Sequence, residues 1–157
     1  MRGIATSVGV ISDTHGPVRD AAIEALAGSD LIIHAGDVGD PRALDQLREI
    51  APTFAVRGNN DRAPWALELP LNEVVEVGSH LFYVLHEIED LDLDPIAAEI
   101  SVVISGHSHE PAAEQRGDVL YLNPGSAGPR RFKLPIALAR IEATEDRITN
   151  RIIELEV

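Results

Sequence analysis

The stretch VGVISDTHG, residues 8–16, passes from an apolar run into polar residues within a few positions. A short apolar run of this kind is typical of a buried strand, and the polar residues and Gly16 that follow it are typical of a loop. Two further stretches repeat the arrangement, because residues 31–35 run into GDVGD and residues 53–56 run into RGNND. The repetition predicts parallel strands whose loops begin at one edge of a sheet.

Helices are expected between these strands. Pro17 and Pro41 are placed to open helices, and Gly28 and Pro52 are placed to end them. Strand, loop and helix units in series are typical of a mostly parallel sheet that is covered by helices.

The second half of the chain is predicted to be rich in strands, some of them antiparallel. Residues 73–77 and 81–85 flank a Gly-Ser pair, as the strands of a β-hairpin do, and a short helix is expected over residues 95–99. Further strands are predicted over residues 102–105, 119–122, 136–141 and 148–155. Because the sequence contains no linker or repeat that would divide it, residues 1–157 are predicted to form a single α/β domain.

Composition restricts the class of protein. The 157 residues include 26 acidic and 13 basic side chains, and the formal net charge of -13 argues against binding to nucleic acid polymers. No apolar run approaches the roughly 20 residues of a membrane span, and the N-terminal run is too short for a signal peptide, so we expect a soluble cytoplasmic protein. The sequence lacks cysteine, which leaves imidazole, carboxylate and amide oxygen as metal ligands.

Side chains that can bind metals follow five of the predicted strands. They are Asp13 and His15 after the first strand, Asp37 after the second, Asn59, Asn60 and Asp61 after the third, His86 after residues 81–85, and His107 and His109 after residues 102–105. Ligands of open α/β sheets bind at the carboxyl ends of strands, where the loops converge. We therefore expect a site for two cations, in which a shared anion offsets the repulsion between ions about 3.5 to 4 Å apart.

The stretch GHSH, residues 106–109, offers two imidazoles to two adjacent ions, and Asp37 is placed to bridge them with its two oxygens. Each motif alone has another explanation, because DTH fits a capped turn and GNND is a common turn sequence. The ordered set of motifs favours a metal site. His34 lies inside an apolar strand and is interpreted as a hydrogen-bonded histidine in the core or behind the ligands.

In their order along the chain, SDTHG, GDVGD, RGNND, the lone His86, GHSH and NPGS resemble the motifs of the calcineurin-like metallophosphoesterases. Within that family the chain is similar to the small single-domain branch that includes the YfcE-type phosphodiesterases and the retromer subunit vacuolar sorting protein 29. The resemblance spans Val8 to about Arg131. It implies a four-layer αββα sandwich with mixed sheets and a dinuclear metal site at the C-terminal ends of the strands.

The resemblance also implies a ligand set. Carried over position by position, the first cation is held by Asp13, His15, Asp37 and His109, and the second by Asp37, Asn59, His86 and His107. A hydroxide that bridges the two cations would attack phosphorus in line. The residues expected to take part in catalysis are Asp37, Asn59, Asn60 and His107. Manganese is the family expectation for the metal, with iron, zinc or nickel as alternatives that suit nitrogen and oxygen donors.

We expect a metal-dependent phosphoesterase, a phosphodiesterase rather than a monoesterase, that acts on a small phosphate ester. A homo-oligomer is compatible with the sequence. The alternative is a catalytically weak or inactive metal-binding scaffold that presents a surface to a protein partner. Two departures from the family pattern keep this alternative open: Asn60 stands where many members have histidine and cannot act as a general acid, and Glu87 follows His86 where glycine is usual.

Other polar residues are given supporting roles. Asp61 is expected to orient its loop or a ligand histidine, and Asn123 with the NPGS turn is expected to be structural, with lining of the substrate site as a second role. The candidates for phosphate contact, with a solvated or ion-paired surface position as the alternative, are Arg57, Arg62, Arg130 and Arg131.

Overall fold

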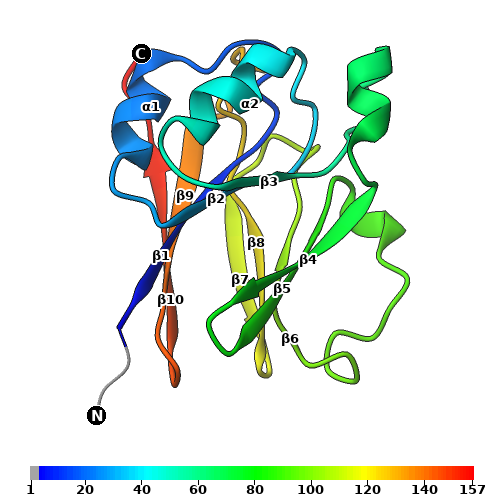
Figure 1. The fold of residues 1–157 in the computed structure, drawn as a ribbon, viewed down its shortest axis with the longest axis vertical. Coiled ribbons are helices and arrows are strands. Elements are labelled where there is room, and N and C mark those ends of the chain that lie inside the picture. The colour runs from blue at the N-terminus through cyan, green and yellow to red at the C-terminus, as the bar shows by residue number, and fades with distance from the viewer. Residues whose placement is uncertain (1–3) are drawn as a thin grey trace.

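The computed structural model describes residues 4–157, in which two five-stranded sheets pack against each other (Figure 1). The first sheet contains β1 (Thr6–Ile11), β2 (Leu31–His34), β3 (Thr53–Ala55), β9 (Ala137–Ala143) and β10 (Ile148–Glu154). The second sheet contains β4 (Asn72–Val77), β5 (His80–Leu85), β6 (Ile100–Ile104), β7 (Ala112–Arg116) and β8 (Val119–Asn123). The helices are α1 (Asp20–Leu26), α2 (Pro41–Arg48) and the short 3₁₀ helices η1 (Pro64–Glu68) and η2 (Ile88–Asp90). None of the helices in this part of the chain is long and apolar enough to cross a membrane.

Both sheets mix parallel and antiparallel strands. The first has the order β10-β9-β1-β2-β3, in which β1, β2 and β3 are parallel, β9 is antiparallel to β1, and β10 is antiparallel to β9. The second has the order β4-β5-β6-β8-β7, with antiparallel strands only at its two edges. Ile11 lies opposite His34, and His34 lies opposite Ala55. The loops after β1, β2 and β3 therefore start side by side.

The space between the sheets is filled by apolar side chains. Val10 and Ile33 of the first sheet pack in one cluster with Phe82, Ile104 and Leu122 of the second, and all five are at most 1% exposed. Burying a side chain of this size stabilises the fold by about 1.5 to 3 kcal/mol. This core fixes the relative position of the two sheets, and with it the position of the loops at their ends.

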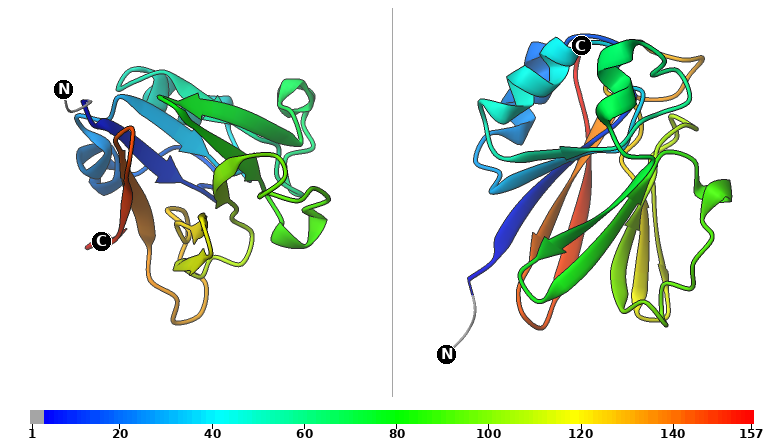
Figure 2. Two further views of the ribbon diagram at one scale, coloured as in Figure 1. Left: turned by 90° about the horizontal axis from the view of Figure 1, so that it is seen from below. Right: turned by 45° about the vertical axis from the view of Figure 1, so that its right-hand side comes forward.

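The outer face of the first sheet is covered by α1 and α2, as Figure 2 shows. Helix α2 starts as predicted, because Pro41 occupies its first turn and Asp40 caps it by accepting from the Arg42 backbone N–H at 2.9 Å. Helix α1 starts at Asp20, three residues after Pro17, and ends before Gly28.

The outer face of the second sheet is covered by residues 86–99, whose Leu91 and Leu93 pack against a cluster that contains Tyr83. The predicted α/β sandwich with mixed sheets is thus confirmed, and its fourth layer is this segment with η2 in place of an α-helix. The short helix predicted over residues 95–99 is wrong. Those residues form turns, and the left-handed φ of Glu99 ends them before the chain enters β6.

Strand β7 and helix η1 had no counterpart among the predicted elements. All five residues of β7, AAEQR, are exposed, because β7 is an edge strand with little to bury on either face. A strand of this kind lacks the alternation of apolar and polar residues that a sequence pattern detects.

Replacing Phe82 by alanine tests the core. Phe82 is completely buried between the sheets, so Phe82→Ala should lower the free energy of unfolding by about 3 to 5 kcal/mol. Phe54→Ala is the matched control, because Phe54 is 41% exposed on β3 and has less apolar contact to lose. Urea unfolding of both variants provides the measurement, and equal losses would contradict the described core.

Candidate metal centre

Five residues of the predicted site share an unusual backbone conformation. Asp13, His15, Asp37, His107 and His109 all have φ between 51° and 71°, in the left-handed region. Among residues 4–157, only two other non-glycine residues do so. A non-glycine residue in this region costs about 1 to 3 kcal/mol and persists where the surrounding structure holds it, as it often does at functional sites. The loops after β1, β2 and β6 are therefore held in the conformation that turns these side chains together.

The loops after β1 and β2 remain hydrogen-bonded to each other beyond the ends of the strands. The backbone N–H of Asp13 donates to the carbonyl of Gly36 at 2.9 Å, and that of His15 donates to the carbonyl of Asp37 at 3.0 Å. Gly39 lies so close to this ladder that a Cβ atom there would collide with the backbone of His15. The paired backbones bring Asp13, His15 and Asp37 to one point.

Asp61 fixes the loop after β3 to the loop after β2. Its carboxylate accepts from the backbone N–H groups of Gly58 at 2.9 Å and of Val38 and Gly39 at 3.1 Å each. The side chain is almost completely buried. Asp61 thus orients the loop that carries Asp37, which is one of the two roles expected for it.

His34, at the end of β2, links the loops after β1 and β2 through hydrogen bonds. Its Nδ1 accepts from the Gly36 N–H at 3.1 Å, so Nε2 carries the hydrogen and lies 3.0 Å from the hydroxyl of Thr14. That hydroxyl in turn donates to the carbonyl of Val38 at 2.8 Å. Burial lowers the pKa of His34 to about 4, although the charge of Asp13 opposes the shift. His34 is a neutral, hydrogen-bonded core histidine, as interpreted.

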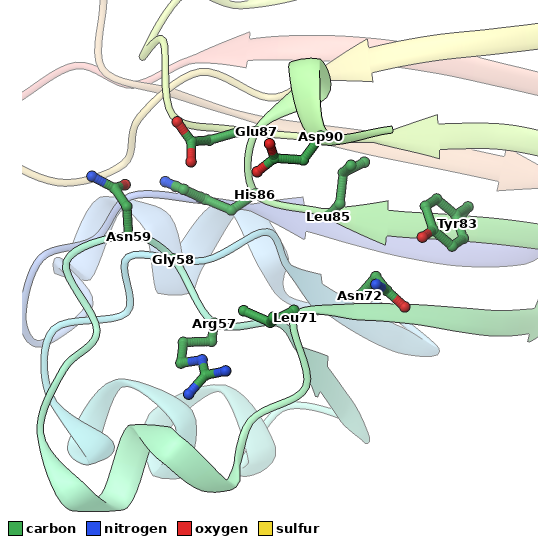
Figure 3. A pocket seen from close by; sticks show the side chains of 10 residues that line it. All are labelled: Arg57, Gly58, Asn59, Leu71, Asn72, Tyr83, Leu85, His86, Glu87 and Asp90. Atoms are coloured by element: carbon green, nitrogen blue, oxygen red, sulfur yellow. The ribbon is translucent and has the colours of Figure 1, made fainter. Parts of the chain in front are cut away.

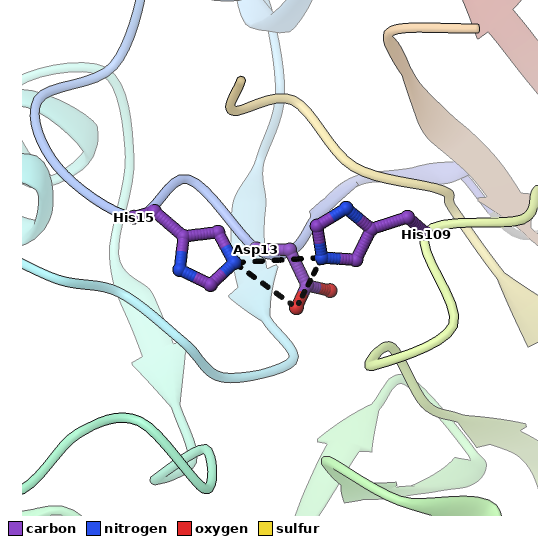
Figure 4. A group of neighbouring side chains, drawn as sticks. All are labelled: Asp13, His15 and His109. Atoms are coloured by element: carbon purple, nitrogen blue, oxygen red, sulfur yellow. Dashed lines mark hydrogen bonds and ion pairs between the residues drawn. The ribbon is translucent and has the colours of Figure 1, made fainter. Parts of the chain in front are cut away.

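Asp13, His15 and His109 form the first of two groups that can hold a metal ion (Figure 4). Oδ1 of Asp13 lies 3.4 Å from Nε2 of His109 and 3.8 Å from Nε2 of His15. The two imidazole Nε2 atoms lie 3.4 Å apart. The three side chains come from the ends of β1 and β6, which belong to different sheets.

Asp13, Asp37 and His86 form the second group. Nε2 of His86 lies 3.4 Å from Oδ2 of Asp37 and 3.8 Å from Oδ1 of Asp13. Its Nδ1 donates to the carbonyl of Ala35 at 2.7 Å, which leaves the lone pair of the neutral ring on Nε2. Asp37 Oδ2 is also 3.7 Å from Nε2 of His15. Both carboxylates therefore face both groups.

Several polar atoms of this cluster are buried without a hydrogen-bond partner within the described residues. They are Asp13 Oδ1, His86 Nε2 and His109 Nδ1. An unsatisfied buried polar atom costs about 1 to 3 kcal/mol, and more when the group is charged. A divalent cation would satisfy the carboxylate oxygen and the imidazole lone pair that face each other here. The residues present therefore fit a metal centre built from nitrogen and oxygen donors.

The electrostatics favour ionised carboxylates. Burial raises the pKa of Asp13, but the imidazole of His109 and the hydroxyl of Ser12 outweigh it and bring the pKa below its usual value. Burial also raises the pKa of Asp37, but His86 and the hydrogen bonds from Asn60 together outweigh it, so this pKa lies well below its usual range. Burial lowers the pKa of His86, but Asp37, Asp13 and the carbonyl of Ala35 together outweigh it, so this pKa is raised. Both carboxylates are negative at neutral pH and available to cations.

The other three predicted site residues lie beside these groups. Asn60 contacts Asp37 twice, through its backbone N–H and its side-chain amide, both at 2.9 Å. Oδ1 of Asn59 lies 3.2 Å from Nδ1 of His107, and Nε2 of His107 lies 3.1 Å from Oε1 of Glu87. All seven predicted metal ligands are thus gathered at one rim, but the side chains of His107 and Asn59 contact each other rather than the buried carboxylates.

Sequence reasoning missed the role of Ser12. Its hydroxyl donates to Oδ2 of Asp13 at 2.6 Å, and the backbone N–H of His107 donates to the same oxygen at 3.0 Å. These bonds saturate one carboxylate oxygen and direct the other into the site. A serine at the end of an apolar run gives no signal of this role. Asn123 is structural, as expected, because its amide donates to the carbonyl of Gly106 at 3.0 Å.

A cavity of about 290 Å³ adjoins the second group (Figure 3). Asn59 and His86 lie at one end of it, with Glu87 and Asp90 on one side and Arg57 on the opposite side. Arg57 is the one candidate for phosphate contact that lines this cavity.

The profile of the calcineurin-like phosphoesterase superfamily domain matches residues 7–146. A probable metallophosphoesterase of Methanocaldococcus jannaschii is 35% identical over 162 residues, which cover 95% of this chain and 81% of that protein. The phosphodiesterase YfcE of Escherichia coli is 30% identical over 139 residues, which cover 73% of this chain and 76% of that protein. The chain belongs to the calcineurin-like phosphoesterase superfamily, as the motifs indicated.

The fold is shared with proteins of much lower identity. The structure of vacuolar protein sorting 29 from Cryptosporidium parvum matches with a TM-score of 0.77 at 18% identity, over 98% of this chain and all of that one. At this identity the match shows a common fold alone.

The buried His34 predicts a pH dependence of stability. Its pKa is about 4 when folded and 6.5 when unperturbed, so the unfolded chain binds a proton first as the pH falls between these values. The free energy of unfolding should therefore fall by about 3 kcal/mol as the pH is lowered from above 6.5 to about 4. His34→Asn, which keeps an acceptor for the Gly36 N–H, should show a flatter profile. The measurement is urea unfolding of chelator-treated protein, and parallel profiles for the two proteins would contradict the assignment.

Proposed function

We propose that the chain is a metal-dependent phosphodiesterase that uses two divalent cations to hydrolyse a small phosphate diester. The observation that carries the proposal is the pair of buried, ionised carboxylates: within 3.8 Å, Asp13 has three imidazole nitrogens and Asp37 has two. Membership of the phosphoesterase superfamily supports the reaction class.

The ligand assignment is part of the proposal. The first cation would take Asp13, His15, Asp37 and His109, and the second would take Asp37, Asn59, His86 and His107. The close approach of Asp37 Oδ2 to His15 and to His86, at 3.7 and 3.4 Å, supports a bridging role for Asp37. Manganese is the proposed metal, with iron, zinc or nickel as alternatives that the same donors accept.

Cations bound at this site would activate a water molecule as the nucleophile and stabilise negative charge on the phosphoryl oxygens. The chain itself orients the ligands. Asn60 donates twice to Asp37 and so holds this carboxylate in place, and the hydroxyl of Ser12 does the same for Asp13. Because an amide is not a general acid near neutral pH, Asn60 gives no proton to the leaving group. Esters with good leaving groups should therefore react fastest.

The charges around the cavity favour a diester over a monoester. Two carboxylates, Glu87 and Asp90, line the cavity beside the proposed second cation, and Arg57 is the basic residue among its lining residues. A phosphodiester carries one negative charge, whereas a monoester carries up to two near neutral pH, so the monoester is repelled more strongly. This difference supports the preference for diesters.

Asp37→Asn tests the proposed activity. The substitution keeps the shape of the side chain but removes the charge that both cations would share, so hydrolysis of bis-p-nitrophenyl phosphate with added manganese should fall by about 100-fold or more. Asp45→Asn is the matched control, because Asp45 lies exposed on α2. The readouts are the initial rate and the bound metal per chain.

Two outcomes would contradict the proposal. Unchanged turnover in Asp37→Asn would exclude a mechanism that needs both cations at this carboxylate. Bound metal in the wild-type chain without hydrolysis of either mono- or diesters would instead support the alternative function, a metal-binding scaffold for a protein partner.

A further inference from the structure

Glu87 directly follows His86, at the position where the family pattern usually has glycine. It precedes η2, its backbone is extended, with φ -112° and ψ 120°, and its side chain is 35% exposed. In Figure 3 its carboxylate reaches toward the same end of the cavity as the tips of Asn59 and His86. A glycine at this position would have no side chain to offer there.

The carboxylate of Glu87 affects which ring nitrogen of His107 carries the hydrogen. Its Oε1 lies 3.1 Å from Nε2 of His107, and because a lone pair on Nε2 would be repelled by a carboxylate this close, the contact favours the tautomer with the hydrogen on Nε2. In the neutral ring the lone pair is then on Nδ1, which lies 3.2 Å from Oδ1 of Asn59. A lone pair and an amide oxygen repel each other, whereas a cation placed between them would be attracted to both. Both atoms belong to the proposed ligand set of the second cation.

His86, the other imidazole of that set, is arranged in the same way. Its Nδ1 donates to the carbonyl of Ala35 at 2.7 Å, and its Nε2 faces Asp37. Each of the two rings thus has an oxygen atom within 3.1 Å of the nitrogen that faces away from its ligand partners. The acceptor is a backbone carbonyl for His86 and a carboxylate for His107. Acceptors of this kind fix the ring and increase its basicity, and their loss typically weakens metal binding or activity by about 10- to 100-fold.

We infer that Glu87 is a positioning residue for the second cation, which holds His107 with Nδ1 directed at Asn59. The inference rests on the metal centre proposed above and adds to it a residue that the family pattern does not supply. His107 is 41% exposed, so neighbouring side chains restrain it less than they restrain the buried His86. The contact between Glu87 and Nε2 of His107 restrains the His107 ring instead.

Manganese titration of the full-length chain tests the inference. The variants are Glu87→Ala and Glu87→Gln, with Glu89→Ala as the control on an exposed carboxylate of the same segment. In Glu87→Ala the second equivalent of manganese should bind about 10- to 100-fold more weakly, while the first equivalent is unchanged. Glu87→Gln should lose less, because its amide oxygen still accepts from His107. Glu89→Ala should bind like the wild type.

Three results would overturn the inference. The first is an unchanged second equivalent in Glu87→Ala. The second is a Glu87→Gln variant as weak as Glu87→Ala, which would make Glu87 a direct ligand. The third is equal weakening of both equivalents. Hydrolysis of bis-p-nitrophenyl phosphate by the wild type, measured in parallel, separates this failure from that of the proposed function: continued turnover leaves the function standing, whereas a wild type that binds fewer than two cations contradicts both.

Discussion

Two negative charges, those of Asp13 and Asp37, are buried side by side at the ends of neighbouring parallel strands, and the rest of the site depends on stabilising them. Both charges would be costly without partners, because burial disfavours the ionised form. The chain supplies hydrogen bonds from Ser12 to one carboxylate and from Asn60 to the other. Imidazoles from both sheets converge on the oxygens that remain, and these positions suit divalent cations. The apolar core matters to function because it holds the two sheets, and therefore these groups, in register.

The fold could be predicted from the sequence where burial imposes a pattern. The apolar runs that became β1, β2, β5 and β6 were recognised because strands buried on both faces leave little choice of residue. The pattern failed at the periphery. Strand β7 is fully exposed at a sheet edge, and residues 95–99 contain enough helix-forming residues to suggest a helix where the chain forms turns. The structure of such exposed segments depends on packing and hydrogen bonds that cannot be predicted from a single sequence.

The sequence predicted which side chains meet at one edge of the fold. Polar residues that follow buried parallel strands must meet at one edge, and all seven expected ligands lie there. The orientation of these side chains was not predictable, because it depends on contacts between distant segments. The pairing of Glu87 with His107 joins the ends of β5 and β6, and the bond from the backbone N–H of His107 to Asp13 joins the ends of β6 and β1. Neither contact can be predicted from the residues next to it in the sequence.

The most direct test of the central claim is anomalous diffraction from crystals grown or soaked with manganese. The account predicts two peaks about 3.5 to 4 Å apart, with Asp37 in contact with both. Asp13, His15 and His109 should surround the first peak, and His86, His107 and Asn59 the second. A crystal in which His15, Asp37 and His109 point away from one another, with no anomalous density among them, would contradict it.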